Sequence, residues 1–425
     1  MKRLAILVLA SLLILVLAPR PSLAQNTISA SYDTDVKFPD SLTFRLDAES
    51  GTDITQITLS YKVDKITTVT LINEVVPEFD AATEVVTSWE WDMRMASLPP
   101  GAEIHYNWKI EDAAGHELET AWQTVRFSDD RYQWKSVTAG KISLFWYQGE
   151  RSFAEELLDT ASDALEKLGQ DTGAYLEQSA EIYIYASSED LLGALIYPQE
   201  WTGGVAFTDY GILAIGIGPG DASWGKRAMT HELTHLVTYQ MTFNPYNNIP
   251  SWLNEGLSMY AEGELEPTFT YYLDNAISAD SLISVQSLSS SFPTDPDEAR
   301  LSYAESYNLV EFLIENYGSE KMLSLLDTFQ QGSTYDNALE KVYGFDTAGL
   351  DNLWRRSLGL GPRPSPTPTP QVTATPTPTP QTGFLECKEA SATTKHGAVG
   401  LGALGILLLP GIGEVMRFKA RRGKR

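Results

Sequence analysis

Two patterns of hydrophobic and polar residues follow one another along the chain. Between residue 26 and about residue 130, short runs of alternating apolar and polar positions predict β-strands. The predicted strands are 43–46, 54–63, 69–76, 85–91, 104–110 and 120–127. Turn residues separate them at 49–51, 99–101 and 112–115. This pattern predicts an all-β sandwich of the immunoglobulin or fibronectin class over residues 25–130.

Six aromatic residues of this region permit two interpretations. One is a platform for carbohydrate, and the other is a set of core and cross-strand pairs, which the strand pattern favours. The residues are Tyr61, Trp89, Trp91, Tyr106, Trp108 and Trp122.

Beyond residue 131 the apolar positions change to helical spacing, apart from three short strands predicted at 142–147, 182–185 and 211–218. The predicted helices are 153–168, 228–241, 252–262, 302–317, 320–329 and 350–358. A small sheet followed by helices predicts an α+β domain, which we place at residues 136–360.

Both ends of the chain differ from the body. A basic start, an apolar run over 4–18 and small residues at 22 and 24 predict a signal peptide at 1–24, with an uncleaved anchor as the alternative. Residues 361–396 contain a Pro/Thr tract that predicts an extended stalk. Residues 397–416 predict a transmembrane anchor or sorting segment, and 417–425 a basic cytoplasmic tail. The ends therefore predict a secreted protein held on the extracellular face of the cell membrane.

Charge and cysteine content exclude several classes of function. The formal net charge is −25, and residues 25–361 hold 19 basic against 53 acidic side chains, a charge of −34. A nucleic-acid-binding surface needs a basic face, so we expect no nucleic-acid partner. The single cysteine, Cys387, excludes a disulfide framework and a cysteine-rich zinc site. It lies just outside the predicted anchor, where a processing or lipidation site and an idle thiol are both open.

One motif carries clear chemistry: His231-Glu232-Leu233-Thr234-His235. Histidines four residues apart on a helix face the same way and can bind one zinc ion. The alternative is two histidines on a solvated helix that bind no metal. Glu232 lies beside that face, placed to take a proton from a zinc-bound water whose pKa the metal lowers.

A catalytic zinc site needs a third protein ligand. One type of zinc site takes this ligand from a histidine six residues after the second one, but Met241 occupies that position here. We therefore expect a carboxylate, and Glu255 follows the helix-start signal Pro250-Ser251. With Asn254-Glu255-Gly256, the sequence resembles the gluzincin metallopeptidases, in particular the peptidase MA-like and aminopeptidase N-like branches. The resemblance implies a zincin-like, thermolysin-type catalytic domain with zinc bound by His231, His235 and Glu255.

Further residues follow from this resemblance. Glu262 matches an acidic residue that orients a ligating histidine, with a solvated helix end as the alternative. Tyr303 matches the tyrosine that donates its hydroxyl to the oxyanion, and Tyr307 competes for that role.

The chain departs from the aminopeptidase pattern in one respect. The glutamate that holds a substrate's free amine is missing from 201–207, where Asp209 is the nearest acid. This difference favours an endopeptidase slightly. Residues 211–215 are either the edge strand against which a peptide lies or a buried strand.

The prediction is a surface-anchored zinc metallopeptidase that acts on a peptide or protein, with Glu232 as general base. The alternative is a non-catalytic surface binding or adhesion protein on a zincin-like scaffold. Zinc-dependent hydrolysis of a non-peptide substrate also fits the motif.

Overall fold

The computed structural model describes residues 27–66, 69–198, 202–246 and 248–363. These residues divide into two compact units, one made of 27–64 and 69–128 and the other of 65–66 and 129–363. The predicted signal peptide, nearly all of the stalk, the anchor, the tail and Cys387 lie outside the described residues. None of the described helices is both long enough and apolar enough to cross a membrane.

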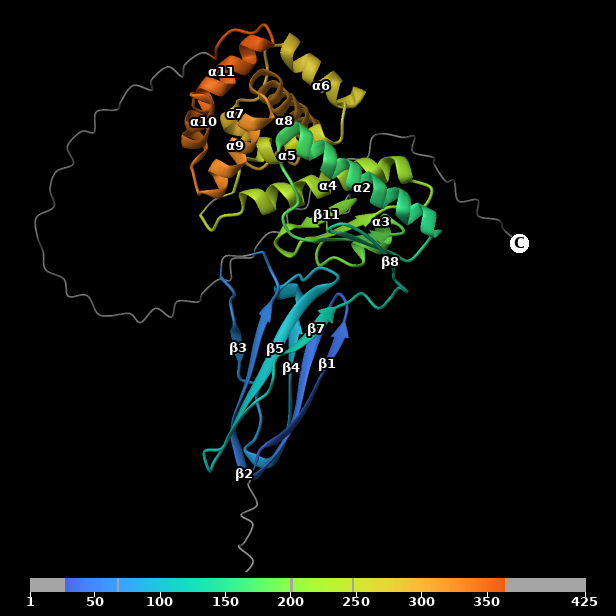
Figure 1. Ribbon diagram of the computed structural model, residues 1–425, viewed down its shortest axis with the longest axis vertical. Helices are drawn as coiled ribbons and strands as arrows, with labels where there is room; N and C mark the ends of the chain where they lie inside the picture. Colours follow the sequence, from blue (N-terminus) through green and yellow to red (C-terminus); the bar gives the residue numbers. More distant parts are fainter. Residues whose placement is uncertain (1–26, 67–68, 199–201, 247, 364–425) are drawn as a thin grey trace, which may run out of the picture. The chain divides into compact units, whose positions relative to one another are not determined.

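The first unit is built of β-strands (Figure 1). They are β1 (Ser29–Lys37), β2 (Ser41–Val63), β3 (Asn73–Val75), β4 (Ala82–Asp92), β5 (Ala102–Asp112), β6 (Glu117–Glu119) and β7 (Gln123–Phe127). The first part of β2 pairs with β1 and β4, and its second part pairs with β3 and β5. β5 also pairs with β6 and β7. The long strand β2 therefore pairs with two different sets of strands along its length.

Strand β2 corrects one expectation from the sequence. We predicted a turn at 49–51 between two strands, but the strand continues through these residues. Its pairing register with β4 shifts between Glu49 and Ile54, which is an irregularity in the ladder rather than a turn. The predicted strand 69–76 is also wrong in extent, since only Asn73–Val75 pairs.

Aromatic side chains fill the interior of this unit. Phe44 on β2 and Tyr106 on β5 are buried, with ring centroids 5.0 Å apart. Trp108 is fully buried, and Tyr61 contacts both Trp89 and Trp91. Trp122 differs, because 41% of its surface is exposed and Lys62 lies over its ring. Five of the six aromatic residues thus form core and cross-strand contacts.

The second unit begins with a five-stranded sheet in the order β11-β12-β10-β9-β8. The strands are β8 (Lys135–Ala139), β9 (Ile142–Trp146), β10 (Ala180–Tyr185), β11 (Gly204–Phe207) and β12 (Ile212–Gly216). β9, β10 and β12 are parallel, while β8 and β11 run antiparallel at the two edges. β12 is fully buried between β11 and β10. The edge strand is therefore Gly204–Phe207, and 211–215 is the buried strand.

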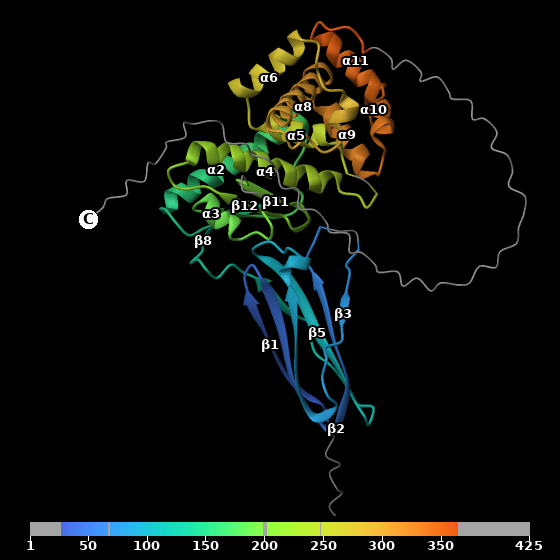
Figure 2. The same cartoon turned by 180° about the vertical axis from the view of Figure 1, so that it is seen from behind.

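Helices cover one face of this sheet and form the rest of the unit. They are α2 (Arg151–Thr172), α3 (Ser188–Leu192), α4 (Ala222–Thr242), α5 (Ser251–Ala261), α6 (Pro267–Ser278), α7 (Val285–Leu288), α8 (Pro296–Tyr317), α9 (Ser319–Gln330), α10 (Tyr335–Tyr343) and α11 (Thr347–Ser357). α2 and α4 contact the sheet, and α5 lies between α4 and α8 (Figures 1 and 2). A β-rich unit followed by a mainly helical one agrees with the prediction.

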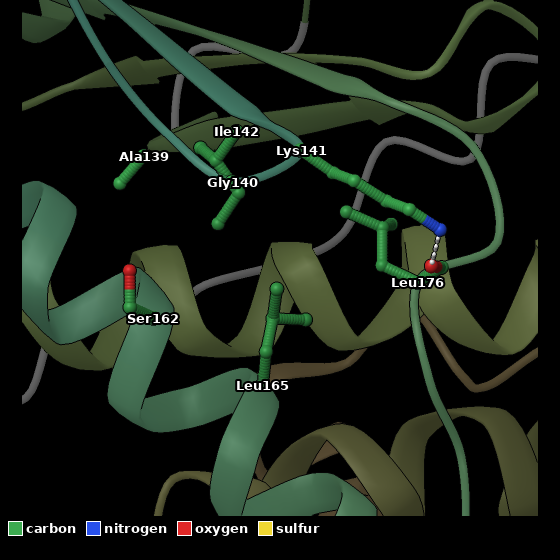
Figure 3. A pocket seen from close by; sticks show the side chains of 7 residues that line it. All are labelled: Ala139, Gly140, Lys141, Ile142, Ser162, Leu165 and Leu176. Carbon is green, nitrogen blue, oxygen red and sulfur yellow. Dashed lines mark hydrogen bonds between the residues drawn. The ribbon is translucent and has the colours of Figure 1, made fainter.

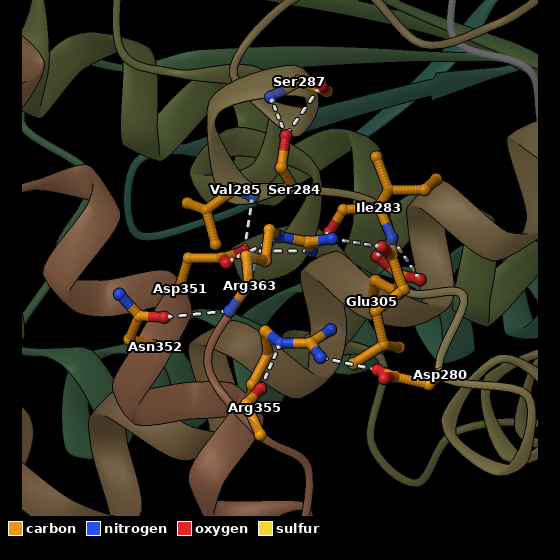
Figure 4. Close-up of polar contacts among 12 residues, drawn as sticks. Asp280, Ile283, Ser284, Val285, Ser287, Glu305, Asp351, Asn352, Arg355 and Arg363 are labelled. Atoms are coloured by element: carbon orange, nitrogen blue, oxygen red, sulfur yellow. Dashed lines mark hydrogen bonds and ion pairs between the residues drawn. The ribbon is translucent and has the colours of Figure 1, made fainter. Parts of the chain in front are cut away.

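The last described residue is fixed to the helical part of this unit (Figure 4). The Arg363 guanidinium donates to Asp351 Oδ2 at 2.7 Å and to the backbone oxygens of Leu282 and Ile283 at 3.0 and 2.8 Å. Both oxygens of the buried Glu305 carboxyl accept from the Ile283 backbone N–H. The loop before α7 is therefore held from two sides, by α8 and by the end of the domain.

Candidate metal centre

Helix α4 brings the two histidines of the motif into the interior. His231 and His235 are 0% and 2% exposed, and their ring centroids are 4.8 Å apart, as expected for residues one helical turn apart. A Cβ atom on Gly225 would lie 2.4 Å from Ile217 Cγ2, so glycine lets the first turns of α4 pack closely on the chain after β12. The helix is thereby fixed against the sheet.

Helix α5 supplies the third residue. It begins after Pro250, whose extended backbone (φ −64°, ψ 145°) precedes the first helical turn. Glu255 Oε2 lies 3.5 Å from Nε2 of His231 and 3.5 Å from Nε2 of His235. Candidate ligand atoms of these three buried residues lie within 4.8 Å of one another. The structure therefore brings together the three residues that the sequence proposed as ligands.

Among the described residues, the facing atoms of these three side chains have no other partner. Nε2 of His231, Nε2 of His235 and Oε2 of Glu255 are buried and make no hydrogen bond within the described part of the chain. A separation of 3.5 Å is too long for a good N–H···O bond, and leaving buried polar atoms unpaired costs free energy. Two imidazoles and one carboxylate are a donor set that catalytic zinc uses. The residues present fit a zinc ion.

Glu262 and Arg227 flank this group. His231 Nδ1 donates to Glu262 Oε1 at 2.6 Å, and Arg227 contacts Glu262 Oε2 at 3.0 Å. Burial by itself lowers the pKa of His231, but the carboxylates of Glu255 and Glu262 outweigh it and raise that pKa to about 10. Glu262 is therefore not a solvated helix end, because it contacts His231 as the resemblance implied.

Glu232 lies beside the group, at the contact between α4 and the edge strand. It is fully buried, and neither carboxyl oxygen has a hydrogen-bond partner among the described residues. A Cβ atom on Gly204 of β11 would lie 3.2 Å from Glu232 Cγ. Burial raises the pKa of Glu232, which makes this carboxylate a stronger base. The sequence did not reveal Gly204, because its role depends on this contact between distant segments.

Tyr303 and Tyr307 have different surroundings on α8. The ring centroids of Tyr303 and His231 lie 6.5 Å apart. The Tyr303 ring also packs edge-on against Phe292. Burial, together with the charges of Glu255, Glu232 and Glu262, raises the pKa of Tyr303 well above 10. Tyr307 instead donates its hydroxyl to Glu311 Oε1 at 3.1 Å. Of these two candidates, Tyr303 lies next to the buried histidines.

Other candidate residues are engaged elsewhere. Asp209, the nearest acid to the edge strand, accepts a hydrogen bond from Tyr239. His116 contacts Asp112, and His105 contacts Asp64 in a second group with Glu103. That second group is a set of partly exposed ion pairs in the β-unit, in which Arg126 lies 3.3 Å from Glu103. His396 lies outside the described residues.

A hollow of about 330 Å³ lies away from these residues (Figure 3). It is lined by Ala139, Gly140, Lys141, Ile142, Ser162, Leu165 and Leu176. The Lys141 ammonium donates to the backbone oxygen of Leu176 at 2.8 Å, so the one charged group of the lining is already paired. The hollow contains none of the proposed ligands.

Comparison with known proteins supports this interpretation. The resemblance inferred from the sequence is confirmed: residues 160–359 match the Peptidase MA superfamily. This match includes α4, α5 and α8, which carry His231, His235, Glu255 and Tyr303. The superfamily and the buried His-His-Glu group together support a metallopeptidase domain.

Two solved structures show weaker likeness. An M1 zinc metallopeptidase from Deinococcus radiodurans, in complex with a Tyr-Ser-Ala substrate, is 13% identical. The likeness covers 83% of this chain and 98% of that one, with a TM-score of 0.34. An aminopeptidase N family protein from Idiomarina loihiensis is 10% identical, with 78% and 72% covered and a TM-score of 0.28. At TM-scores below 0.5, neither likeness supports a conclusion about fold or activity. No curated protein matches the sequence.

Proposed function

We propose that the second unit is a zinc-dependent peptidase in which His231, His235 and Glu255 bind the metal and Glu232 is the general base. The observation that carries the proposal is the group of three facing, buried and unpaired ligand atoms, with the unpaired Glu232 carboxyl beside them. Burying polar atoms of four side chains without hydrogen-bond partners is costly, and their use in binding and catalysis explains why they are present.

Each residue has a chemical role in this proposal. When bound, zinc acts as a Lewis acid that lowers the pKa of a water molecule and polarises a carbonyl group. Glu232 takes the proton of the attacking water and then delivers it to the leaving amine. Burial raises its pKa, which favours the protonated carboxyl that this transfer requires. The Tyr303 hydroxyl donates a hydrogen bond to the carbonyl oxygen as negative charge develops on it.

We further propose that the substrate is a peptide cleaved internally. Strand β11 is an edge strand beside Glu232, and an extended peptide can add to such an edge by main-chain hydrogen bonds. Residues 202–207 contain no acid to bind a free amine, and Asp209 is already bonded to Tyr239. Peptides with a blocked N-terminus should therefore be cleaved. Cleavage confined to peptides with a free N-terminal amine would instead identify an aminopeptidase.

The finer features of architecture and location remain proposals. We propose that the β-unit is an immunoglobulin- or fibronectin-like sandwich, because β2 pairs with two different sets of strands. The thermolysin-type arrangement of the second unit is proposed from the family match. Export through residues 1–24 and anchoring through 397–416 are proposed from the sequence alone.

The proposed function is tested by the Glu232→Gln variant of the full chain. Glutamine keeps the shape but loses the base, so we expect cleavage of a peptide library to fall by about 100- to 10,000-fold. Elemental analysis should still find one zinc ion per chain, since Glu232 is not a ligand. Glu264→Gln, an exposed glutamate of the same unit, is the matched control.

Two outcomes would contradict the proposal. A well-folded wild-type protein that binds no zinc would refute the metal site. Zinc binding without any cleavage that a chelator abolishes would favour the non-catalytic surface protein instead.

A further inference from the structure

Helix α5 and its C-cap residue, Glu262, present three polar side chains on one face. Glu255, Ser258 and Glu262 are separated by three and four residues, so their side chains follow one another along the same side of the helix. Glu255 approaches both histidines, and Glu262 contacts His231. Ser258, between them, has no role in the function proposed so far.

Ser258 contacts the second histidine. Its Oγ lies 3.2 Å from His235 Nδ1, and the two residues are 0% and 2% exposed. The other ring nitrogen, His235 Nε2, faces Glu255 Oε2 at 3.5 Å. The two nitrogens of this imidazole therefore face opposite partners, a hydroxyl on one side and the proposed ligand group on the other.

The tautomer of His235 decides whether it can bind a metal. A neutral imidazole carries one proton, and the nitrogen that ligates must keep its lone pair. Since Nε2 faces Glu255, a ligating His235 carries its proton on Nδ1, and Ser258 Oγ accepts it. Without the hydroxyl, a buried Nδ1–H would be unpaired, which costs free energy. The tautomer with its proton on Nε2 would then be favoured, and that proton would point at Glu255. Neither His235 Nε2 nor the facing oxygen of Glu255 would be free to bind the metal.

The two histidines are held by chemically different groups. The carboxylate of Glu262 can only accept from His231, so it fixes the Nδ1–H tautomer by itself. A serine hydroxyl can donate or accept, and it carries no charge. His235 therefore depends on a weaker and neutral contact, and a change at Ser258 should act on the metal through this histidine alone.

We propose that Ser258 is a positioning residue, which accepts the Nδ1 proton of His235 and so keeps Nε2 free to bind the metal. This inference rests on the proposed zinc binding by His231, His235 and Glu255. It adds a residue of this chain that acts on the metal only through a ligand.

The test measures the zinc affinity of the full-length chain by competition with a chromophoric chelator. Partners that orient a ligating histidine typically change metal affinity by about 10- to 100-fold, and we expect Ser258→Ala to weaken zinc binding by this factor. Ser258→Thr retains the hydroxyl and should restore most of the affinity. Ser289→Ala is the matched control, because Ser289 is a buried serine whose hydroxyl donates only to a backbone oxygen, that of Val285.

A second measurement needs no variant in the metal site. In the zinc-loaded wild-type protein, ¹⁵N shifts of labelled histidine should show His235 protonated at Nδ1 and ligated through Nε2. The opposite assignment would overturn the inference, as would a Ser258→Ala protein that binds zinc as tightly as wild type. These failures leave the proposed function intact, whereas a wild-type protein without zinc would overturn both.

Discussion

Tyr303 and Tyr307 show how residues one helical turn apart can have different roles. Both are largely buried on α8, but the Tyr307 hydroxyl is bonded to Glu311, whereas Tyr303 packs between Phe292 and His231. The sequence could not separate them, since both fit the same helical pattern. The separation comes from what lies opposite each ring.

Replacing Tyr303 by Phe should lower kcat and leave KM almost unchanged. The hydroxyl is proposed to bind the oxygen only as charge develops on it, and the loss of one such donor costs about 100-fold or more in kcat. Steady-state kinetics on one blocked peptide would measure this effect. Tyr307→Phe is the control, and equal effects of the two variants would contradict the assignment.

Glu305 provides a prediction about pH. Burial is the largest cause that raises the pKa of this carboxyl from 4.5 to about 8, partly opposed by the Ile283 N–H. The folded protein then binds a proton more tightly than the unfolded chain. Its stability contribution is present below about pH 4.5 and is lost as the pH rises towards 8.

The Glu305→Gln variant should remove this dependence. Between pH 5 and pH 8, the wild-type free energy of unfolding should fall relative to the variant, by at most about 1.4 kcal/mol per pH unit. Urea unfolding of both proteins at several pH values would measure the difference. Parallel pH profiles would show that Glu305 titrates normally.

At the scale of elements, the contact of α5 with α8 positions Glu255. A Cβ atom on Gly256 would lie 2.4 Å from the Ser306 backbone oxygen and 2.7 Å from Val310 Cγ2. Only glycine allows the two helices to come this close. The residue after the proposed ligand therefore sets how deeply α5 lies in the unit.

Gly256→Ala should consequently weaken both fold and metal binding. Overpacking of this kind costs about 1–3 kcal/mol, and a shift of α5 would displace Glu255 from the histidines. Thermal unfolding and zinc titration would report the two effects. Gly220→Ala, where a Cβ would meet nothing within 4 Å, should change neither.

The elements also show what sequence patterns can and cannot predict. Helices α4, α5 and α8 were expected because their apolar positions repeat at helical spacing, and the motif placed both histidines on one face. Strand β11 and the continuous β2 were missed, because pairing with distant strands decides them. Ser258 and Gly204 were missed for the same reason: each acts through a contact with another element.

For the molecule as a whole, metal binding should stabilise one unit selectively. Any ligand that binds only the folded state adds stability, about 2.7 kcal/mol at 100 times its Kd. Chelation should therefore lower the unfolding temperature of the full chain. Hydrogen exchange should accelerate in α4 and α5 and stay unchanged in β1–β7. Equal acceleration in both units would contradict a site confined to residues 129–363.

The segment between the two proposed ligand helices has a consequence of another kind. An ion held by His235 and Glu255 would close residues 236–254 into a ring, as a disulfide closes a loop. Unlike a disulfide, this closure exists only while the site is folded, because a preformed metal site rarely persists in an unfolded chain. Opening the ring therefore requires release of the ion, and the closure stabilises the fold by the free energy of metal binding. The only cysteine of the sequence is Cys387, so no disulfide can close a loop within the described residues. The loop would then be closed by metal coordination, which a chelator rather than a reductant can remove.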